Sequence, residues 1–510
     1  MTSSLSVIIP AQNEADTIGE VVAEAQRLSP LEIIVVANGS SDRTKEICLS
    51  KGCAVYEYAQ ALGNDVGRSV GAYHAKGSIL LFLDGDIPIP HAQLLPFVRA
   101  IEQGYDIALN EMNWSLLLSP IPHYTAAAKV AFNRMLRRPE LGANSLVAVP
   151  HAMSKKAVDA IGFENLSNPC FAQAIASLKQ LSFVCPASVD VIRQNKLRPA
   201  HSARSEHSVY PKSTTRIIGD HLEALHFMTG RLGPRGEFSE GIRDRGFLRH
   251  YVPPSAKTKA KRSAVIPVME EGRTIKDVVR SVRAAGVDEI IVVANGADDR
   301  TVRGAMEAGA RVMVFGRPLG HNVGRAIGAA CSTGDVCLFV DGDFVVPPQD
   351  LVPFIQAVEQ GADVAFNDME TLFRRFRPVD PISAVKYFLN ICLGKPELLN
   401  NSLTAVPHAL SRTILSRIGC DCLVIPPLAQ AKAALAGCRL QAAHAVDVVT
   451  PNRPRTDHAA EGNRIPAFER IIGDHLEAID YLLRLKGPRG GFPDTERNAA
   501  AISFLKGKGT

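Results

Sequence analysis

The residues with the clearest chemical potential are two pairs of aspartates, each pair separated by one glycine. Asp84 and Asp86 end the apolar run that begins at Ser78, and Asp341 and Asp343 follow a second such run. Two carboxylates on one turn can hold a hard divalent cation and leave room for phosphate oxygens. Such a cation would stabilise the charge that a diphosphate gains as its bond to carbon breaks. Asp-Gly is also a common turn. The prediction therefore depends on the position of each DGD turn after a predicted buried strand, and on its occurrence twice in the chain.

Two loops at predicted strand ends carry small and polar residues. The first strand leads into Pro10 to Glu14, and the second into Asn38 to Asp42. Small and amide-bearing residues let backbone N–H groups approach a nucleobase, and a carboxylate can accept hydrogen bonds from ribose or base. Each loop taken alone is more typical of a tight turn or helix cap. Together we expect them to reach one ligand.

Two arginines and two histidines recur at matching places. Arg68 and Arg325 each follow a glycine before a predicted helix, where a guanidinium could bind diphosphate as a charged fork. The alternative is an arginine on a helix surface. His151 and His408 follow an apolar run and a proline, which suits either a sugar or acceptor contact or a satisfied structural histidine.

Strands and helices must position these side chains, and their pattern is regular. Short apolar runs at Val7 to Ile9, Ile33 to Val36 and Ile79 to Leu83 predict buried strands. Helical patterns lie between them, at Thr17 to Leu28 and Asp42 to Lys51. Strand followed by helix predicts right-handed βαβ units and a mostly parallel sheet. Ligands of such sheets bind at the carboxyl ends of the strands, where the polar residues fall.

The whole pattern occurs twice. SVIIPAQNEADTI from Ser6 matches AVIPVMEEGRTI from Ala264, and Pro10 pairs with Pro267 at an offset of 257 residues. The DGD turns and the segments EIIVVANG, VPHA and IIGDHLEA also recur, and we interpret the last as a helical surface that packs the copies or domains together. The repeat predicts two domains and an intramolecular pairing that mimics a homodimer. The expected boundaries are 1–240 for the first domain, 241–262 for a basic linker and 263–510 for the second domain.

Composition excludes several classes of protein. The chain has 510 residues, 46% hydrophobic and 21% charged, as globular proteins do. Its net charge of +5 is concentrated between Arg243 and Arg262, where seven Lys or Arg accompany one Asp, so we expect no nucleic-acid partner. Ten cysteines without a CxxC pair disfavour a disulfide framework or zinc site. No apolar run suffices for a membrane span or a signal peptide, and we expect a cytoplasmic protein.

The motifs together resemble the family-two glycosyltransferases, twice over. The resemblance rests on the IIPAQNEADTI opening, the VVANGSSDRT second strand, the GNDVGRSVGA segment and the LFLDGD turn. It implies an α/β fold of two tandem GT-A domains, Rossmann-like nucleotide-diphospho-sugar transferase units with mostly parallel mixed sheets. It also implies metal-dependent transfer of a sugar from a nucleoside-diphosphate sugar to a small-molecule or peripheral acceptor.

The resemblance carries over to individual residues. Asp86 and Asp343 would be the catalytic ligands of Mg²⁺ or Mn²⁺. The expected nucleotide-sugar-binding residues are Pro10, Ala11, Glu14, Asn38, Asp42, Arg68 and Asp84 in the first repeat, and Pro267, Glu271, Asn295, Asp299, Arg325 and Asp341 in the second.

A further similarity is to the glucosyl-3-phosphoglycerate synthase branch, in which a histidine of a C-terminal loop joins the metal site. His201 in RPAHSAR and His458 in RPRTDHAA fit that role. A neutral imidazole suits a divalent cation already held by carboxylates. The alternative is a surface histidine in a polar loop.

The sequence also departs from the family pattern. Many inverting members carry a Glu-Asp pair that supplies a general base, and neither repeat has it; Glu164 and Asp421 are the nearest acidic substitutes. The stereochemical course stays open, with a retaining course slightly favoured. The second repeat also lacks a counterpart of Asn13, although both DGD turns predict metal sites.

Two other functions remain open at the level of sequence. A nucleotidyltransferase shares a related nucleotide-binding half, but such enzymes carry a glycine-rich basic loop after the first strand, where this chain has AQNEADT. A non-catalytic tandem scaffold with vestigial sites would explain the missing Glu-Asp pair. The sugar, the base of the donor and the acceptor are not specified by fold.

Overall fold

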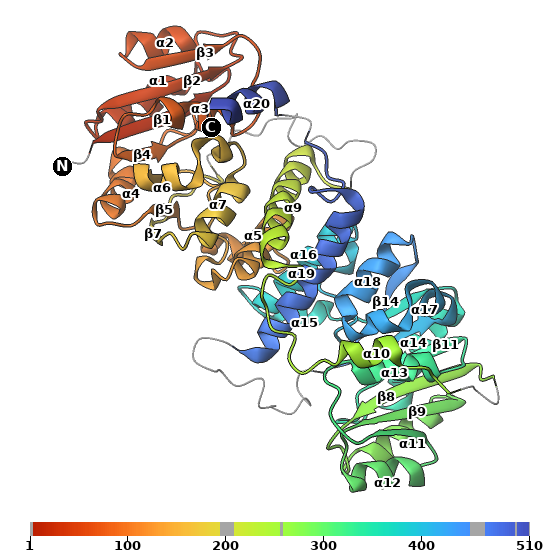
Figure 1. The fold of residues 1–510 in the computed structure, drawn as a ribbon. Coiled ribbons are helices and arrows are strands. Elements are labelled where there is room, and N and C mark those ends of the chain that lie inside the picture. The colour runs from red at the N-terminus through yellow and green to blue at the C-terminus, as the bar shows by residue number, and fades with distance from the viewer. Residues whose placement is uncertain (1–3, 194–208, 255–258, 449–464, 495–496, 509–510) are drawn as a thin grey trace. The chain divides into compact units, whose positions relative to one another are not determined.

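The computed structural model describes residues 4–193, 209–254, 259–448, 465–494 and 497–508 (Figure 1). The chain divides into two compact units. The first unit contains Met1–Met228 and Lys486–Thr510, and the second contains Thr229–Leu485. Among the described residues, no helix combines the length and apolar character that crossing a bilayer requires.

The first unit is built on one mixed, mostly parallel sheet of seven strands, in the order β3-β2-β1-β4-β6-β5-β7. Strand β6 runs antiparallel to its neighbours β4 and β5, and the other pairs are parallel. The strands are β1 (Leu5–Ala11), β2 (Glu32–Asn38), β3 (Ala54–Tyr58), β4 (Ile79–Phe82), β5 (Ile107–Asn110), β6 (His151–Ser154) and β7 (Phe183–Ala187).

The helices of the first unit alternate with these strands, as the sequence pattern predicts. They are α1 (Ile18–Gln26), α2 (Thr44–Ser50), α3 (Val66–His74), α4 (His91–Glu102), η1 (Asn113–Leu117), α5 (Tyr124–Met135), η2 (Pro139–Leu141), α6 (Lys155–Ile161), η3 (Phe163–Ser167), α7 (Pro169–Leu178), α9 (Lys212–Leu232) and α20 (Ala499–Lys508).

The second unit repeats the same sheet, in the order β10-β9-β8-β11-β13-β12-β14. Its strands are β8 (Arg262–Val268), β9 (Glu289–Asn295), β10 (Arg311–Phe315), β11 (Val336–Phe339), β12 (Val364–Asn367), β13 (His408–Ser411) and β14 (Leu440–His444). Its helices are α10 (Arg245–His250), α11 (Ile275–Ala284), α12 (Asp299–Glu307), α13 (Val323–Cys331), α14 (Pro348–Glu359), α15 (Glu370–Arg375), α16 (Pro381–Cys392), η4 (Pro396–Leu398), α17 (Arg412–Ile418), η5 (Cys420–Val424), α18 (Pro426–Leu435) and α19 (Pro466–Lys486).

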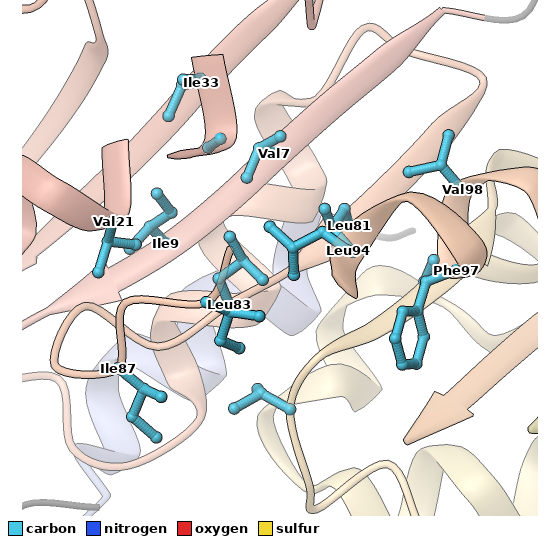
Figure 2. Packing of buried hydrophobic residues seen from close by; sticks show 14 of the residues in the cluster. Val7, Ile9, Val21, Ile33, Leu81, Leu83, Ile87, Leu94, Phe97 and Val98 are labelled. Carbon is cyan, nitrogen blue, oxygen red and sulfur yellow. The ribbon is translucent and has the colours of Figure 1, made fainter. Parts of the chain in front are cut away.

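The cores form because the strands are apolar on both faces. In β1 the side chains of Val7 and Ile9 enter one cluster, and that of Ile8 enters another on the opposite face of the sheet. Figure 2 shows the first cluster, where Ile9 lies beside Val21 of α1 and Leu81 beside Leu94 of α4. Removing these fully buried side chains from water stabilises the fold by about 1.5–3 kcal/mol each.

Glycines allow α3 to lie directly against β1. A Cβ added at Gly67 would lie 2.8 Å from Pro10 Cβ, and one at Gly71 would lie 2.3 Å from Ile8 Cγ2. In the second unit a Cβ at Gly328 would meet Val265 Cγ1 at 2.3 Å, so α13 approaches β8 in the same way. This close approach brings the arginine that follows the first glycine of each helix to the carboxyl end of the sheet.

The last segment of each sequence repeat folds with the other unit, so the units differ from the predicted domain boundaries. The segment after α19 belongs to the first unit, where α20 packs on α3 and η3 (Figure 1), and Asn498 N–H donates to Leu62 O at 2.8 Å. The segment after α9 belongs to the second unit, where α10 packs on α13 and η5, and Asp244 N–H donates to Leu319 O at 2.8 Å. Each unit therefore contains the tail that follows the long helix of the other repeat.

Part of the segment expected to be a basic linker is consequently folded. The side chain of Arg243 is fully buried and pairs with Asp474 at 2.6 Å. Arg245 pairs with Glu477 at 2.8 Å at the start of α10. The acidic partners lie on α19, about 230 residues away in sequence. The local sequence around these arginines contains few acidic residues, so it predicts a solvated basic segment and gives no sign of the ion pairs.

Candidate functional site

The first DGD turn follows β4 and packs on the loop that follows β1. A Cβ at Gly85 would lie 3.0 Å from Ala11 Cβ and 3.3 Å from Pro10 O, so glycine suits this close approach. Thr17 Oγ1 donates a hydrogen bond to Gly85 O at 2.9 Å. The turn is thereby joined to the loop expected to bind nucleotide.

Arg68 holds the first aspartate of this turn. Its Nη2 lies 3.3 Å from Asp84 Oδ1, and its Nη1 lies 3.1 Å from Asp65 Oδ1 and donates to Leu146 O at 3.2 Å. Arg68 is 6% exposed, so it is not an arginine on a helix surface. Burial works to lower the pKa of its guanidinium, and the charges of Asp65 and Asp84 outweigh that effect and raise the pKa.

The same pairing determines the electrostatics of the aspartates. Burial raises the pKa of Asp84, Arg68 opposes that rise, and the negative charge of Asp86 adds to it. A divalent cation at this turn would relieve the repulsion between the two carboxylates. Asp86, the expected metal ligand, is half-buried on the same turn.

The second unit reproduces the arrangement. A Cβ at Gly342 would lie 2.6 Å from Val268 Cγ1, and Thr274 Oγ1 donates to Gly342 O at 2.6 Å. Arg325 is buried, and its Nη2 lies 2.8 Å from Asp341 Oδ1. Asp343 lies at the end of this turn.

Side chains of the first unit tie together the loops after β1 and β2, which are expected to bind nucleotide and are called the nucleotide loops. Glu14 N–H donates to Thr44 Oγ1 at 2.9 Å, and Ala15 N–H donates to Asp42 Oδ2 at 2.9 Å. Ser41 N–H donates to Asn13 Oδ1 at 2.8 Å. Burial of Asp42 raises its pKa, but hydrogen bonds from Thr44 and Ala15 outweigh this and lower it. The carboxylate of Asp42 therefore shapes the loop.

Asn38 and Asn295 fix the loop that leads into the arginine-bearing helix. Asn38 Oδ1 accepts from Leu62 N–H, and its Nδ2 donates to Gly63 O at 3.3 Å. Asn295 Oδ1 accepts from Leu319 N–H at 2.6 Å, and its Nδ2 donates to Gly320 O at 3.1 Å. These amides hold the backbone beside the expected nucleotide position.

The second unit joins its nucleotide loops differently. Asp298 caps α12 by accepting from Thr301 N–H at 2.6 Å, whereas Asp299, the sequence counterpart of Asp42, is exposed on the first turn of that helix. Asp298 N–H donates to Met269 O at 3.1 Å, which joins the loops through the backbone. Glu271 lies in the first of these loops and accepts from Met269 N–H.

His151 and His408 occupy structural positions. Burial lowers the pKa of each imidazole to about 3, with the charge of Arg68 adding to the effect at His151 and that of Arg325 at His408. Their Nδ1 atoms lie 2.9 Å from Ala148 O and 2.8 Å from Ala405 O. Each ring stacks on a phenylalanine of the neighbouring strand. Both are neutral buried side chains.

The acidic substitutes for a general base fold onto their own backbone. A Cβ at Gly162 would lie 2.4 Å from Glu164 Oε1, and one at Gly419 would lie 2.5 Å from Asp421 Oδ1. Asn165 Nδ2 also donates to Glu164 Oε1 at 3.3 Å. The two acids therefore take the same local role at the start of η3 and η5.

Carboxylate oxygens are the ligands that Mg²⁺ and Mn²⁺ prefer, so the donor set of each DGD turn fits either cation. His201 and His458, the expected histidine ligands, lie outside the described residues. Within the described part of the chain, no group of three or more His, Cys, Asp or Glu is arranged to hold a metal. Further ligands would come from phosphate, water or those histidines.

Sequence reasoning missed Asp65, Asp220 and Arg497, which are buried or nearly so and join the tail of the chain to Arg68. Asp65 stands three residues before Arg68 in the GNDVGR segment, and that spacing was the available signal. Asp220 lies in the IIGDHLEA repeat, whose duplication marked it without indicating a partner.

Comparison with known proteins identifies one family. The family described as Glycosyl transferase family 2 matches residues 6–112 and 263–378. Glycosyltransferase AglE of Haloferax volcanii is 41% identical over 108 residues, covering 19% of this chain and 35% of that protein. Glucosyl-3-phosphoglycerate synthase of Mycolicibacterium paratuberculosis is 34% identical over 110 residues, covering 19% of this chain and 32% of that protein. The matched region thus spans about a third of these relatives.

A solved structure of glucosyl-3-phosphoglycerate synthase from Mycobacterium tuberculosis in complex with uridine diphosphate also matches. It aligns at 19% identity and a TM-score of 0.33, covering 44% of this chain and 80% of that chain.

Proposed function

We propose that the protein transfers a sugar from a nucleoside-diphosphate sugar to a small-molecule or peripheral acceptor, with Mg²⁺ or Mn²⁺ as cofactor, because a segment in each half of the chain matches glycosyl transferase family 2. The observation that carries the proposal is the pair of DGD turns. Each turn is joined to the nucleotide loop by a threonine and has its first aspartate paired with a buried arginine.

The residues of each site would divide the work as follows. In the first unit the loops after β1 and β2 would line the nucleotide position, because the backbone N–H groups of Glu14, Ala15 and Ser41 and the side chains that accept from them fix the two loops to each other. Asp86 and Asp343 would bind the cation, which when bound supplies positive charge toward the departing diphosphate. Arg68 and Arg325 would keep Asp84 and Asp341 in place.

Neither repeat has the Glu-Asp pair, so another group would have to deprotonate the acceptor. Glu164 and Asp421 are engaged with their own loops, so an oxygen of the donor phosphate or a residue beyond the DGD turn would have to accept the proton. The anomeric configuration of the product distinguishes a retaining from an inverting course.

The proposal is tested with a panel of UDP-, GDP- and ADP-sugars, with Mn²⁺ present or chelated, by measuring release of free nucleoside diphosphate. We expect metal-dependent turnover with one donor class. The double variant Asp86→Ala, Asp343→Ala should lose at least about 100-fold in turnover, because the charge that stabilises the leaving group is lost. The single variants report how activity divides between the sites.

The matched control is Asp159→Ala, which removes an exposed carboxylate that pairs with Lys155 on α6. It should turn over donor like the unaltered protein. Full activity in the double variant would refute the proposal. Metal-dependent donor binding without turnover across a broad acceptor panel would instead identify a scaffold.

A further inference from the structure

A buried aspartate on α9 is held by two arginines from the tail of the chain. Asp220 Oδ1 lies 2.7 Å from Arg489 Nη1, and both Asp220 oxygens accept from Arg497, at 2.8 and 2.7 Å. The side chains of Asp220 and Arg497 are each 3% exposed. In an environment that excludes water, a two-pronged pair of this kind fixes both partners in one geometry.

The contacts continue from Arg497 to the first DGD turn. Arg497 Nη2 lies 3.6 Å from Asp65 Oδ2, and its Nε donates to Asn64 O at 3.3 Å. Asp65 Oδ1 in turn lies 3.1 Å from Arg68, whose other nitrogen lies 3.3 Å from Asp84. We call Asp220, Arg497, Asp65, Arg68 and Asp84 the ionic chain.

Other charged groups face this chain without replacing its links. Arg216 Nη1 lies 3.9 Å from Asp65 Oδ2, a longer approach than that of Arg497. Asp494 Oδ2 lies 3.0 Å from Arg497 Nη1, and Glu223 pairs with Arg489 at 2.8 Å. Among the residues that the structure describes, Arg497 is therefore the cation nearest to the Asp65 oxygen that Arg68 does not use.

The second unit has the buried part of this arrangement and lacks its link to the DGD turn. Asp474, on α19, pairs with Arg235 at 2.7 Å. Its two oxygens also accept from Nη1 and Nη2 of Arg243, at 2.6 and 2.7 Å. Asn322 stands where the first unit has Asp65: each is the left-handed residue before its helix, with φ of 63° and 64°. An amide carries no charge, so Arg243 has no carboxylate to bridge toward Arg325.

A nitrogen of Arg243 reflects the same difference. Arg497 Nε has a carbonyl partner in the loop before α3. Within the described residues, Arg243 Nε is buried and finds no hydrogen-bond partner. The guanidinium of Arg497 is thus hydrogen-bonded to the loop before α3, whereas within the described residues that of Arg243 makes no such bond to the loop before α13.

We propose that Arg497 is a positioning residue for the first site, acting through Asp65 and Arg68 on Asp84, and that the described part of the second unit has no equivalent. The inference rests on the proposed function of the DGD turns. Arg497 fixes Asp65 through Oδ2, and Asp65 Oδ1 then holds Nη1 of Arg68. Held in this way, Arg68 presents Nη2 to Asp84. Without Arg497, Asp65 is free to reorient and draw Arg68 away from Asp84, and the metal-binding turn loses its fixed carboxylate.

The test uses the full chain carrying Asp343→Ala, so that turnover reports the first site. In this background Arg497→Lys keeps the charge and removes the fork that spans Asp220 and Asp65. We expect the Mn²⁺ concentration for half-maximal turnover to rise by about 10- to 100-fold, as for other residues that orient metal ligands, with the KM for donor little changed. Asp65→Asn should reproduce the effect, because asparagine tolerates the left-handed conformation and cannot form the ion pairs.

Arg243→Lys in the same background is the matched control. It disturbs the equivalent buried aspartate in the second unit, so its melting temperature should fall about as much as that of Arg497→Lys. Its Mn²⁺ requirement should stay unchanged. Equal shifts in the Mn²⁺ requirement for both lysine variants, or an unshifted requirement in Asp65→Asn, would overturn the inference.

The inference and the proposed function fail in distinguishable ways. If the Asp343→Ala protein releases nucleoside diphosphate normally and Arg497→Lys does not alter its Mn²⁺ requirement, the inference alone is wrong. If the unaltered protein neither turns over any donor nor binds Mn²⁺ with UDP, GDP or ADP by calorimetry, the proposed function is wrong and the inference fails with it.

Discussion

At the scale of single residues, the two sites are organised by a few buried polar side chains whose partners are fixed. Arg68 and Arg325 stand at the centre of each site because the preceding glycine lets the helix approach the first strand. Their pairing with Asp84 and Asp341 holds the first carboxylate of each DGD turn, and the proposed function assigns the second carboxylate to the cation. The DGD motif therefore depends on a residue 16 positions earlier.

The buried histidines predict a specific response to acid. Burial lowers the pKa of His151 to about 3, so between its ordinary value near 6.5 and about 3 the unfolded chain binds a proton that the folded chain does not. Folding stability must fall as pH falls through that window, by about 2 kcal/mol per histidine at pH 5. His151→Gln removes this titration and keeps a donor for Ala148 O.

Urea unfolding at pH 7.5 and pH 5 measures the effect. We expect His151→Gln to be less stable than the unaltered protein at pH 7.5, because it loses the stacked contact with Phe82, and the difference to shrink or reverse at pH 5. A constant difference between the two unfolding midpoints at both pH values would contradict the assignment of His151 as a neutral core residue.

At the scale of elements, the seating of α3 on β1 positions the first site. Gly71→Ala places a methyl group where Ile8 Cγ2 already lies 2.3 Å away, and the helix must move to accommodate it. We expect a loss of about 1–3 kcal/mol in stability and a fall in first-site turnover, because Arg68 moves with the helix. Thermal unfolding and donor turnover in the Asp343→Ala background check this.

A second glycine provides the control for helix propensity. Gly230 lies in α9 with nothing within 4 Å of an added Cβ. Gly230→Ala should therefore stabilise by about 0.5–1 kcal/mol and leave turnover alone. If Gly71→Ala behaved like Gly230→Ala, α3 would not be held against β1 as described.

Much at this scale was predictable from sequence. The runs at Val7, Ile33 and Ile79 form parallel strands with helices between them, as their apolar pattern predicts. The position of the DGD turns at strand ends follows from the same pattern. The exact helix starts did not follow: α2 begins at Thr44, whose N–H donates to Asp42 Oδ1 at 3.0 Å, whereas α12 begins at Asp299 and is capped by Asp298.

At the scale of the whole molecule, the sequence repeat runs through both halves of the chain, but the two structural units do not coincide with those halves. Each unit contains the segment that follows the long helix of the other repeat. No periodicity within a helix or strand encodes such contacts, since Arg497 meets Asn64 across 433 residues of sequence and Asp220 across 277. The repeat marked IIGDHLEA as a shared segment. Only the fold showed that its aspartates, Asp220 and Asp474, form ion pairs with arginines distant from them in sequence.

The two repeats have also diverged in how their sites are supported. Side chains tie the nucleotide loops in the first unit, and a backbone bond ties them in the second. The ionic chain reaches the DGD turn in the first unit, and Asn322 ends it in the second. Both turns nevertheless keep two carboxylates and a buried arginine, so the proposed function assigns a cation to each.

The most direct test of that central claim is the number of Mn²⁺ ions bound per chain in the presence of nucleoside diphosphate, measured by electron paramagnetic resonance of free Mn²⁺. We predict two ions for the unaltered protein, one for either Asp86→Ala or Asp343→Ala, and none above background when both are replaced. An unchanged number of bound ions in the double variant would contradict the account, because the cations would then be held elsewhere.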